Sequence, residues 1–234
     1  MSRLITAMVA LALLVSAGIR MDPVHPMRVS DNDIVGLNTS LNRVAVIGDS
    51  YTTGTDMGGL GTKGWTARAW GDLANHRVPI TADVGAEGGA GYGTRGNRGS
   101  LFEDLTARTV RPDDVLVVFF GSRNDQGVDP VSLWTMANTN FDLARRTAPA
   151  ARLLVIGPPW PTADVPASVV QIRDILGAAA RTAGATFVDP LAEGWFVGMP
   201  ELIGADGVHP TDAGHAYMAD KIAPLIRSQL PERY

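Results

Sequence analysis

Short apolar runs alternate with longer amphipathic stretches from residue 43 almost to the end of this chain. The runs are rich in β-branched and aromatic residues, as strands buried on both faces are, and the stretches between them are long enough for helices. Such alternation implies parallel strands joined by right-handed crossovers. The pattern therefore predicts the α/β fold class, as a three-layer α/β/α sandwich around a mainly parallel five-stranded sheet.

The predicted elements follow one another regularly. Strands are expected at residues 44–47, 79–84, 115–120, 153–156 and 186–188, and helices at residues 65–75, 100–110, 131–147, 167–183 and 212–230. Asp129-Pro130 and Thr211-Asp212 supply N-terminal caps for the third and the last of these helices. Because ligands of such sheets bind beyond the carboxyl ends of the strands, reactive residues are expected directly after strands.

The beginning of the chain has the pattern of a secretory leader. Arg3 gives a positive start, residues 4–19 form an uncharged apolar run, and Val15-Ser16-Ala17 places small residues before a cleavage point after Ala17. The run is short for a membrane span, which needs about 20 apolar residues. The prediction is an exported protein, secreted or associated with the cell envelope, with an uncleaved N-terminal anchor as the alternative to cleavage. Its expected parts are a signal peptide at 1–17, a linker at 18–42 and one folded domain at 43–234.

Composition excludes several classes of function. The formal net charge is −4 and the basic residues do not cluster, which argues against a nucleic acid partner. The chain has no cysteine, so disulfides, thiolate nucleophiles and cysteine metal sites are excluded. No clustered histidines suggest a catalytic metal, and the glycine pattern at residues 91–96 lies too far beyond its strand for a dinucleotide site. No cofactor is expected.

The first predicted strand runs directly into Gly48-Asp49-Ser50. A serine at that point projects from the end of the sheet, Gly48 permits a sharp turn, and the Asp49 side chain can accept backbone N–H groups of that turn. A serine hydroxyl becomes an effective nucleophile only with a base in hydrogen-bond reach. The tripeptide alone fits an ordinary turn equally well, so the assignment depends on the segments that follow.

Four separated segments resemble, in order, the SGNH (GDSL-like) hydrolase family over residues 43–217. They are Gly48-Asp49-Ser50, Asp83-Val84-Gly85-Ala86-Glu87-Gly88, Gly121-Ser122-Arg123-Asn124-Asp125 and Asp206-Gly207-Val208-His209-Pro210. Three positions depart from the family pattern: Tyr51 replaces a leucine, Asp83 stands where asparagine is frequent, and two residues rather than one separate Gly121 from Asn124. The resemblance implies the flavodoxin-like arrangement of the sheet and makes residues 43–234 the hydrolase domain.

The resemblance also implies a role for each matched residue. Ser50 is the expected nucleophile, His209 its base, and Asp206 the carboxylate that orients the imidazole, as in other Ser-His-Asp sites. The expected oxyanion hole consists of the N–H of Ser50, the N–H of Gly88 and the side-chain amide of Asn124, with Gly89 as the alternative to Gly88.

These residues predict an exported serine ester hydrolase that works through an acyl-enzyme: a carboxylesterase, a lipase or an O-deacetylase. The expected substrate is a small-molecule, lipid or glycan ester, and the N-terminus could associate the protein with the membrane or cell envelope. An acyltransferase that uses the same site and a catalytically silent envelope-binding protein are the alternatives.

Residues outside the matched segments have lesser expected roles. His25, His76 and His215 are expected at the surface, and Arg95 and Arg98 in a solvated loop, where they could otherwise contact an acidic substrate. Aromatic residues could either form walls of the active-site cleft or pack beneath it. They are Trp65, Trp134, Trp160, Trp195 and Phe196.

Overall fold

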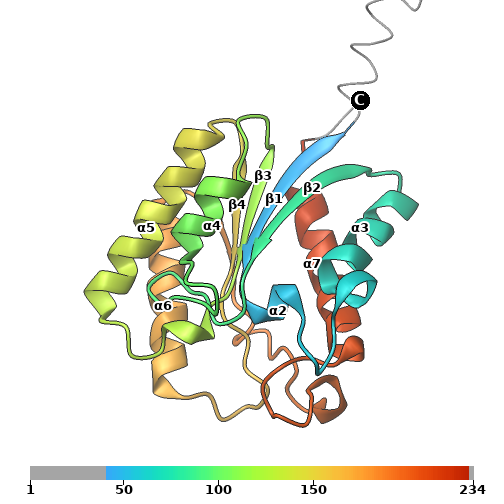
Figure 1. Ribbon diagram of the computed structural model, residues 1–234, viewed down its shortest axis with the longest axis vertical. Coiled ribbons are helices and arrows are strands. Elements are labelled where there is room, and N and C mark those ends of the chain that lie inside the picture. The colour runs from blue at the N-terminus through green and yellow to red at the C-terminus, as the bar shows by residue number, and fades with distance from the viewer. Residues whose placement is uncertain (1–40, 232–234) are drawn as a thin grey trace, which may run out of the picture. The chain divides into compact units, whose positions relative to one another are not determined.

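Five parallel strands form the sheet of the part of the chain that the computed structural model describes, residues 41–231 (Figure 1). Their order across the sheet is β2-β1-β3-β4-β5, and every neighbouring pair is parallel. The strands are β1 (Asn42–Gly48), β2 (Ile80–Ala86), β3 (Leu116–Phe120), β4 (Arg152–Ile156) and β5 (Thr186–Val188). The predicted three-layer α/β/α sandwich with a flavodoxin-like parallel sheet is confirmed.

Helices cover both faces of this sheet. Figure 1 shows α4, α5 and α6 on one face and α3 and α7 on the other, and each face has its own apolar core. The helices are α2 (Ser50–Thr53), α3 (Trp65–Asn75), α4 (Phe102–Thr109), α5 (Pro130–Thr147), α6 (Ala167–Thr182) and α7 (Asp212–Gln229). Short 3-10 turns lie at Gly61–Lys63, Arg123–Asp125 and Pro200–Leu202.

The predicted caps are confirmed. The Asp129 side chain accepts the N–H of Ser132 at 2.9 Å at the start of α5, and Pro130 occupies the first turn, where it needs no donor. The Thr211 hydroxyl accepts the N–H of Gly214 at 3.2 Å at the start of α7. Because α5 follows β3 and α7 follows β5 in a parallel sheet, both capped helix starts come after the carboxyl ends of strands.

The expectation that each strand is buried on both faces is wrong for the two edge strands, β2 and β5. Within the described sheet, β2 pairs with β1 alone and Val84 remains 44% exposed, whereas β5 pairs with β4 alone and Thr186 is exposed. An edge strand is covered by other elements less completely than a central strand. In β2, polar Thr81 and Asp83 accordingly alternate with apolar residues.

The predicted leader and nearly all of the predicted linker lie outside the described residues, and the leader remains a prediction. Within residues 41–231, none of the helices has both the length and the apolar character needed to cross a membrane.

Candidate active site

Ser50 lies where β1 turns into the short helix α2. The Asp49 side chain accepts the N–H of Tyr51 at 2.9 Å and so caps this helix. A side chain at Gly48 would meet the Thr52 hydroxyl at 2.2 Å, so glycine is required for the turn. The tight turn brings the Ser50 hydroxyl to the carboxyl edge of the sheet, where the strand pattern predicted it.

His209 stands between Ser50 and Asp206. Its Nε2 lies 3.0 Å from Ser50 Oγ, and its Nδ1 lies 2.6 Å from Asp206 Oδ2. The other Asp206 oxygen accepts the backbone N–H groups of Val208 and His209, each at 2.9 Å. Desolvation by burial would raise the pKa of Asp206. The hydrogen bond from the His209 side chain and the two backbone hydrogen bonds outweigh this effect and lower the pKa to about 2. The carboxylate is therefore charged above about pH 2, and it contacts the ring nitrogen of His209 that faces away from Ser50.

A second contact joins the loop that carries His209 to the turn that carries Ser50. The Tyr51 hydroxyl donates to the carbonyl oxygen of Val208 over 2.5 Å, and the Tyr51 ring is almost fully buried. Sequence reasoning did not find this contact, although the departure from leucine at position 51 was its signal. Tyr51, which directly follows Ser50, is thus bonded to Val208, which directly precedes His209.

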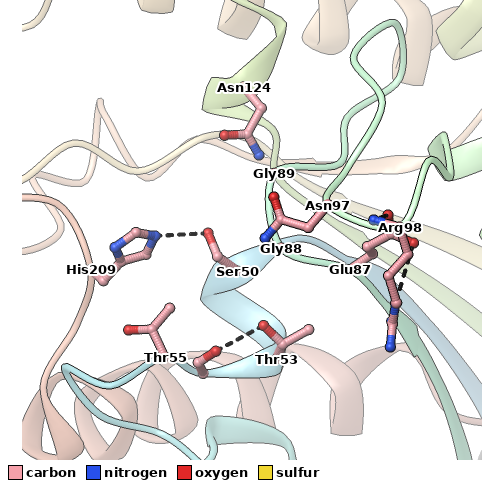
Figure 2. A pocket seen from close by; sticks show the side chains of 11 residues that line it. Ser50, Thr53, Thr55, Glu87, Gly88, Gly89, Asn97, Arg98, Asn124 and His209 are labelled. Carbon is pink, nitrogen blue, oxygen red and sulfur yellow. Dashed lines mark hydrogen bonds and ion pairs between the residues drawn. The ribbon is translucent and has the colours of Figure 1, made fainter.

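The predicted oxyanion donors line one cavity with Ser50 and His209 (Figure 2). Its volume is about 550 Å³. The backbone N–H groups of Ser50, Gly88 and Gly89 donate no hydrogen bond within residues 41–231. All three groups are therefore free to serve a ligand, and Gly88 and Gly89 both remain candidates for the second donor.

The side-chain amide of Asn124 faces the same cavity but also contacts the protein. Its Nδ2 donates to the carbonyl oxygen of Ala90 at 2.9 Å and, over a longer 3.3 Å, to Asp49 Oδ2. Its backbone N–H donates to the Ser122 hydroxyl at 3.0 Å. An oxyanion would thus compete with Asp49 for one N–H of this amide.

Asp49 is a buried carboxyl group beneath the site, 1% exposed. Burial raises its pKa to about 7, against the hydrogen bond from Tyr51, and the nearby charge of Asp125 raises it further. Asp49 also explains why glycine stands at position 121 of the third matched segment. Gly121 adopts a φ of 129°, and a side chain there would come within 2.8 Å of Asp49 Oδ2.

Asp125 organises the glycine-rich loop beside the cavity. Its carboxylate accepts the N–H groups of Tyr92, Gly93 and Thr94 at 2.9 to 3.0 Å, and the Thr94 hydroxyl donates to the carbonyl oxygen of Asn124 at 2.9 Å. A dinucleotide site would need such N–H groups for phosphate. Here the Asp125 carboxylate accepts these N–H groups, so the glycine pattern at residues 91–96 does not offer them to a dinucleotide.

The cavity has further lining residues to which sequence reasoning gave no certain role. They are Thr53, Thr55, Glu87, Asn97 and Arg98. Arg98, expected in a solvated loop, has a side chain that is 72% exposed, yet it lines the cavity. Nothing in the local sequence of Asn97 distinguishes it from other loop residues.

The expected aromatic walls are absent from the lining of this cavity. Trp65, Trp195 and Phe196 are buried in the core, and Trp160 lines a separate pocket. The surface prediction for His215 is also wrong, because this residue is 1% exposed and its Nδ1 accepts the N–H of Trp65 at 3.3 Å. Burial lowers the pKa of His215 to about 4, so it is a neutral core residue.

A serine in contact with a histidine–carboxylate pair is the arrangement that serine hydrolases use, and an α/β sandwich commonly carries it. Residues 46–217 match the model of the GDSL-like lipase/acylhydrolase family. The chain therefore belongs to this family and is an enzyme that hydrolyses ester bonds.

A protein of Mycobacterium tuberculosis named GDSL lipase Rv0518 is 68% identical over 197 residues, which cover 83% of this chain and 85% of that protein. Among solved structures, a lipase/acylhydrolase from Enterococcus faecalis has a TM-score of 0.64 at 15% identity, covering 83% of this chain and 100% of the other. A family two carbohydrate esterase from Clostridium thermocellum, in complex with cellohexaose, has a TM-score of 0.64 at 18% identity, covering 80% and 64%. At such identities these likenesses show the fold alone.

Proposed function

We propose that this enzyme is an exported serine esterase in which Ser50 attacks the ester carbonyl, His209 transfers protons and Asp206 orients His209. One observation carries the proposal. His209 contacts Ser50 Oγ at 3.0 Å through one ring nitrogen and Asp206 at 2.6 Å through the other. These distances satisfy what general base catalysis requires before any substrate binds.

Acylation begins when Ser50 Oγ forms a bond to the carbonyl carbon and its proton moves to His209 Nε2. The carbonyl π electrons become an oxyanion. As the carbonyl re-forms, the bond to the alcohol oxygen breaks and His209 Nε2 returns the proton to that oxygen. Asp206 stabilises the imidazolium that exists between these two transfers.

Deacylation repeats the sequence with water. His209 Nε2 removes a proton from water as its oxygen bonds to the acyl carbon, and then gives that proton to Ser50 Oγ as the acyl bond breaks. The products are a carboxylic acid and an alcohol, and no cofactor enters either step.

The oxyanion that forms in each half-reaction needs donors already in place. The N–H groups of Ser50 and of Gly88 or Gly89 have no acceptor within the described residues, and the Asn124 amide faces the same cavity. Loss of one such donor typically costs about 2.7–4 kcal/mol of barrier.

Export is supported by the sequence pattern of residues 1–17. A C-terminally tagged full-length chain is expected in the culture medium or the cell-envelope fraction, and its retention in the cytoplasm would contradict this part of the proposal. Because one relative is named a lipase and one structural neighbour a carbohydrate esterase, lipid and carbohydrate esters are both substrates to be tested.

Replacement of Ser50 tests the mechanism directly. Ser50→Ala should abolish hydrolysis of p-nitrophenyl acetate and labelling by a fluorophosphonate probe, with an unchanged thermal unfolding curve. Ser228→Ala is the matched control, because Ser228 is exposed near the end of α7. Hydrolysis at the wild-type rate by Ser50→Ala would rule out the proposed nucleophile.

A further inference from the structure

The side-chain amide of Asn97 lines the cavity without a hydrogen-bond partner in the described part of the protein. Its Nδ2 lies 3.1 Å from the position that a Cβ on Gly88 would take. Figure 2 shows this amide directed across the cavity toward Ser50, whereas the guanidinium of Arg98 points away from Ser50. Two N–H donors and one carbonyl acceptor of Asn97 are therefore available to a ligand.

The loop that carries Asn97 is held firmly. The N–H of Asn97 donates to the carbonyl oxygen of Gly88 at 2.9 Å. Glu87, which is 1% exposed, accepts the N–H groups of Arg98 at 2.5 Å and of Ser100 at 3.2 Å. Burial disfavours a charged Glu87, but hydrogen bonds from Ser100 and Arg98 prevail and lower its pKa below the ordinary value. A charged carboxylate thus fixes the backbone of the loop that carries Asn97.

The position of Asn97 shows which part of an ester it would meet. His209 and Asn97 lie on opposite sides of Ser50 (Figure 2). The alcohol oxygen must approach His209 to receive its proton, and the carbonyl oxygen must point to the oxyanion donors. The remaining substituent of the carbonyl carbon is the acyl chain, and it extends to the side of Asn97.

The walls on that side offer little to a long hydrocarbon chain. Thr53, Asn97 and Arg98 line it, with the carboxylate of Glu87 behind them, and no large apolar side chain lines the cavity. A buried methylene contributes to binding only if it leaves water for apolar surroundings. A chain laid against Asn97 would instead remove water from an amide that has no other partner, which is unfavourable.

We propose that Asn97 is a specificity-determining residue that restricts the enzyme to esters of short acyl groups, acetyl to butyryl, and excludes medium and long fatty acyl chains. This inference rests on the proposed function, because the direction of the acyl chain follows from the roles of Ser50 and His209. It names the substrate class of that site.

The acyl-length profile of the full-length enzyme and of Asn97→Leu tests the proposal. With p-nitrophenyl acetate, butyrate and octanoate, the wild-type kcat/KM should fall at least about tenfold from butyrate to octanoate, because the longer chain would remove water from the Asn97 amide without gaining apolar contacts. Asn97→Leu should raise the octanoate-to-acetate ratio of kcat/KM about tenfold, the effect of about two additional methylenes in apolar contact. Asn138→Leu is the matched control, because Asn138 lies on α5 and does not line the cavity. It should leave the ratio unchanged.

A wild-type preference for octanoate, or the same ratio in Asn97→Leu as in the wild type, would overturn the proposal. An equal loss for every ester would also overturn it, because Asn97 would then serve the oxyanion or the fold. Thermal unfolding checks each variant, and Asn97→Val supplies a smaller apolar replacement if the leucine variant does not fold. Fluorophosphonate labelling distinguishes failure of this inference from failure of the proposed function. If Ser50 is labelled but Asn97→Leu leaves the octanoate-to-acetate ratio unaltered, only this inference is rejected. If Ser50 of the wild type is not labelled, the proposed function is rejected.

Discussion

The Tyr51 hydroxyl donates to the carbonyl oxygen of Val208 over 2.5 Å and joins two segments that are 157 residues apart in the chain. One segment is the start of α2, which carries Ser50, and the other is the loop that carries His209. We therefore expect this hydrogen bond to help set the distance between Ser50 Oγ and His209 Nε2.

Tyr51→Phe should lower kcat about tenfold and change KM little, because small displacements of reacting groups slow chemistry strongly. The ring keeps its contacts with Phe120 and Phe196, so the free energy of unfolding should fall by only about 1 kcal/mol. Steady-state kinetics and urea unfolding measure the two effects. Tyr217→Phe is the matched control on α7. A tyrosine that only stabilised the fold would reduce stability and leave kcat unchanged, which would contradict this role.

Asp206→Asn should lower kcat about a thousand- to ten-thousandfold, because an amide no longer stabilises the imidazolium or fixes the tautomer of His209. Asp212→Asn provides the comparison: Asp212 begins α7 and pairs with Lys63 at 2.6 Å, outside the cavity lining. Its kcat should stay within about twofold of the wild type, since exposed ion pairs contribute little. If Asp206→Asn kept more than about a tenth of the activity, the orienting role would be refuted.

Gly88 and Gly89 should respond differently to alanine. Gly89 has a φ of 78°, so Gly89→Ala should lower the free energy of unfolding by about 1–2 kcal/mol. At Gly88 the added methyl meets Asn97 Nδ2 at 3.1 Å, and Gly88→Ala should crowd the cavity and lower kcat/KM with little loss of stability. Denaturant unfolding and ester kinetics on both variants check this. Equal losses of stability in the two variants would be inconsistent with these geometries.

Much of this architecture could be predicted because local patterns specify it. The predicted helix 65–75 coincides with α3, and the predicted strand 186–188 with β5. The Asp206–His209 contact is also local, since the residues are three positions apart. Ser50 follows a buried strand, and the carboxyl ends of parallel strands meet at one edge.

Contacts between segments that are far apart in the sequence could not be predicted in this way. Asn97 lies over Gly88 because the glycine-rich loop folds back on itself, and His215 is buried against Trp65 because α7 packs against α3. Hydrophobic periodicity indicates which face of a helix or strand is apolar, but it does not indicate which distant residues will contact that face. For this reason the sequence pattern predicts a surface position for His215, which is buried in the structure. For the same reason it suggests aromatic residues as walls of the cleft, although none of them lines the cavity.

Asp49 should give the stability of the enzyme a pH dependence of unusual sign. Its carboxyl has an ordinary pKa of 3.8 and a pKa of about 7 in the folded protein, chiefly because of burial. The folded state thus holds the proton more tightly than the unfolded state. The resulting stabilisation is complete below about pH 3.8 and is lost as the pH rises through about 7.

Wild type should therefore lose stability relative to Asp49→Asn as the pH rises across this range. Each unit of pKa difference corresponds to about 1.4 kcal/mol. The groups that face Asp49 from neighbouring elements are the Tyr51 N–H, the Asn124 amide, Asp125 and Arg123, and all remain in the variant. Urea unfolding of both proteins at several pH values measures the difference. Asp129→Asn is the contrasting control, because its capping hydrogen bonds lower the pKa of Asp129 and its contribution is lost as the pH falls. A pH-independent difference between wild type and Asp49→Asn would contradict this prediction, because it would show that folding leaves the pKa of Asp49 unchanged.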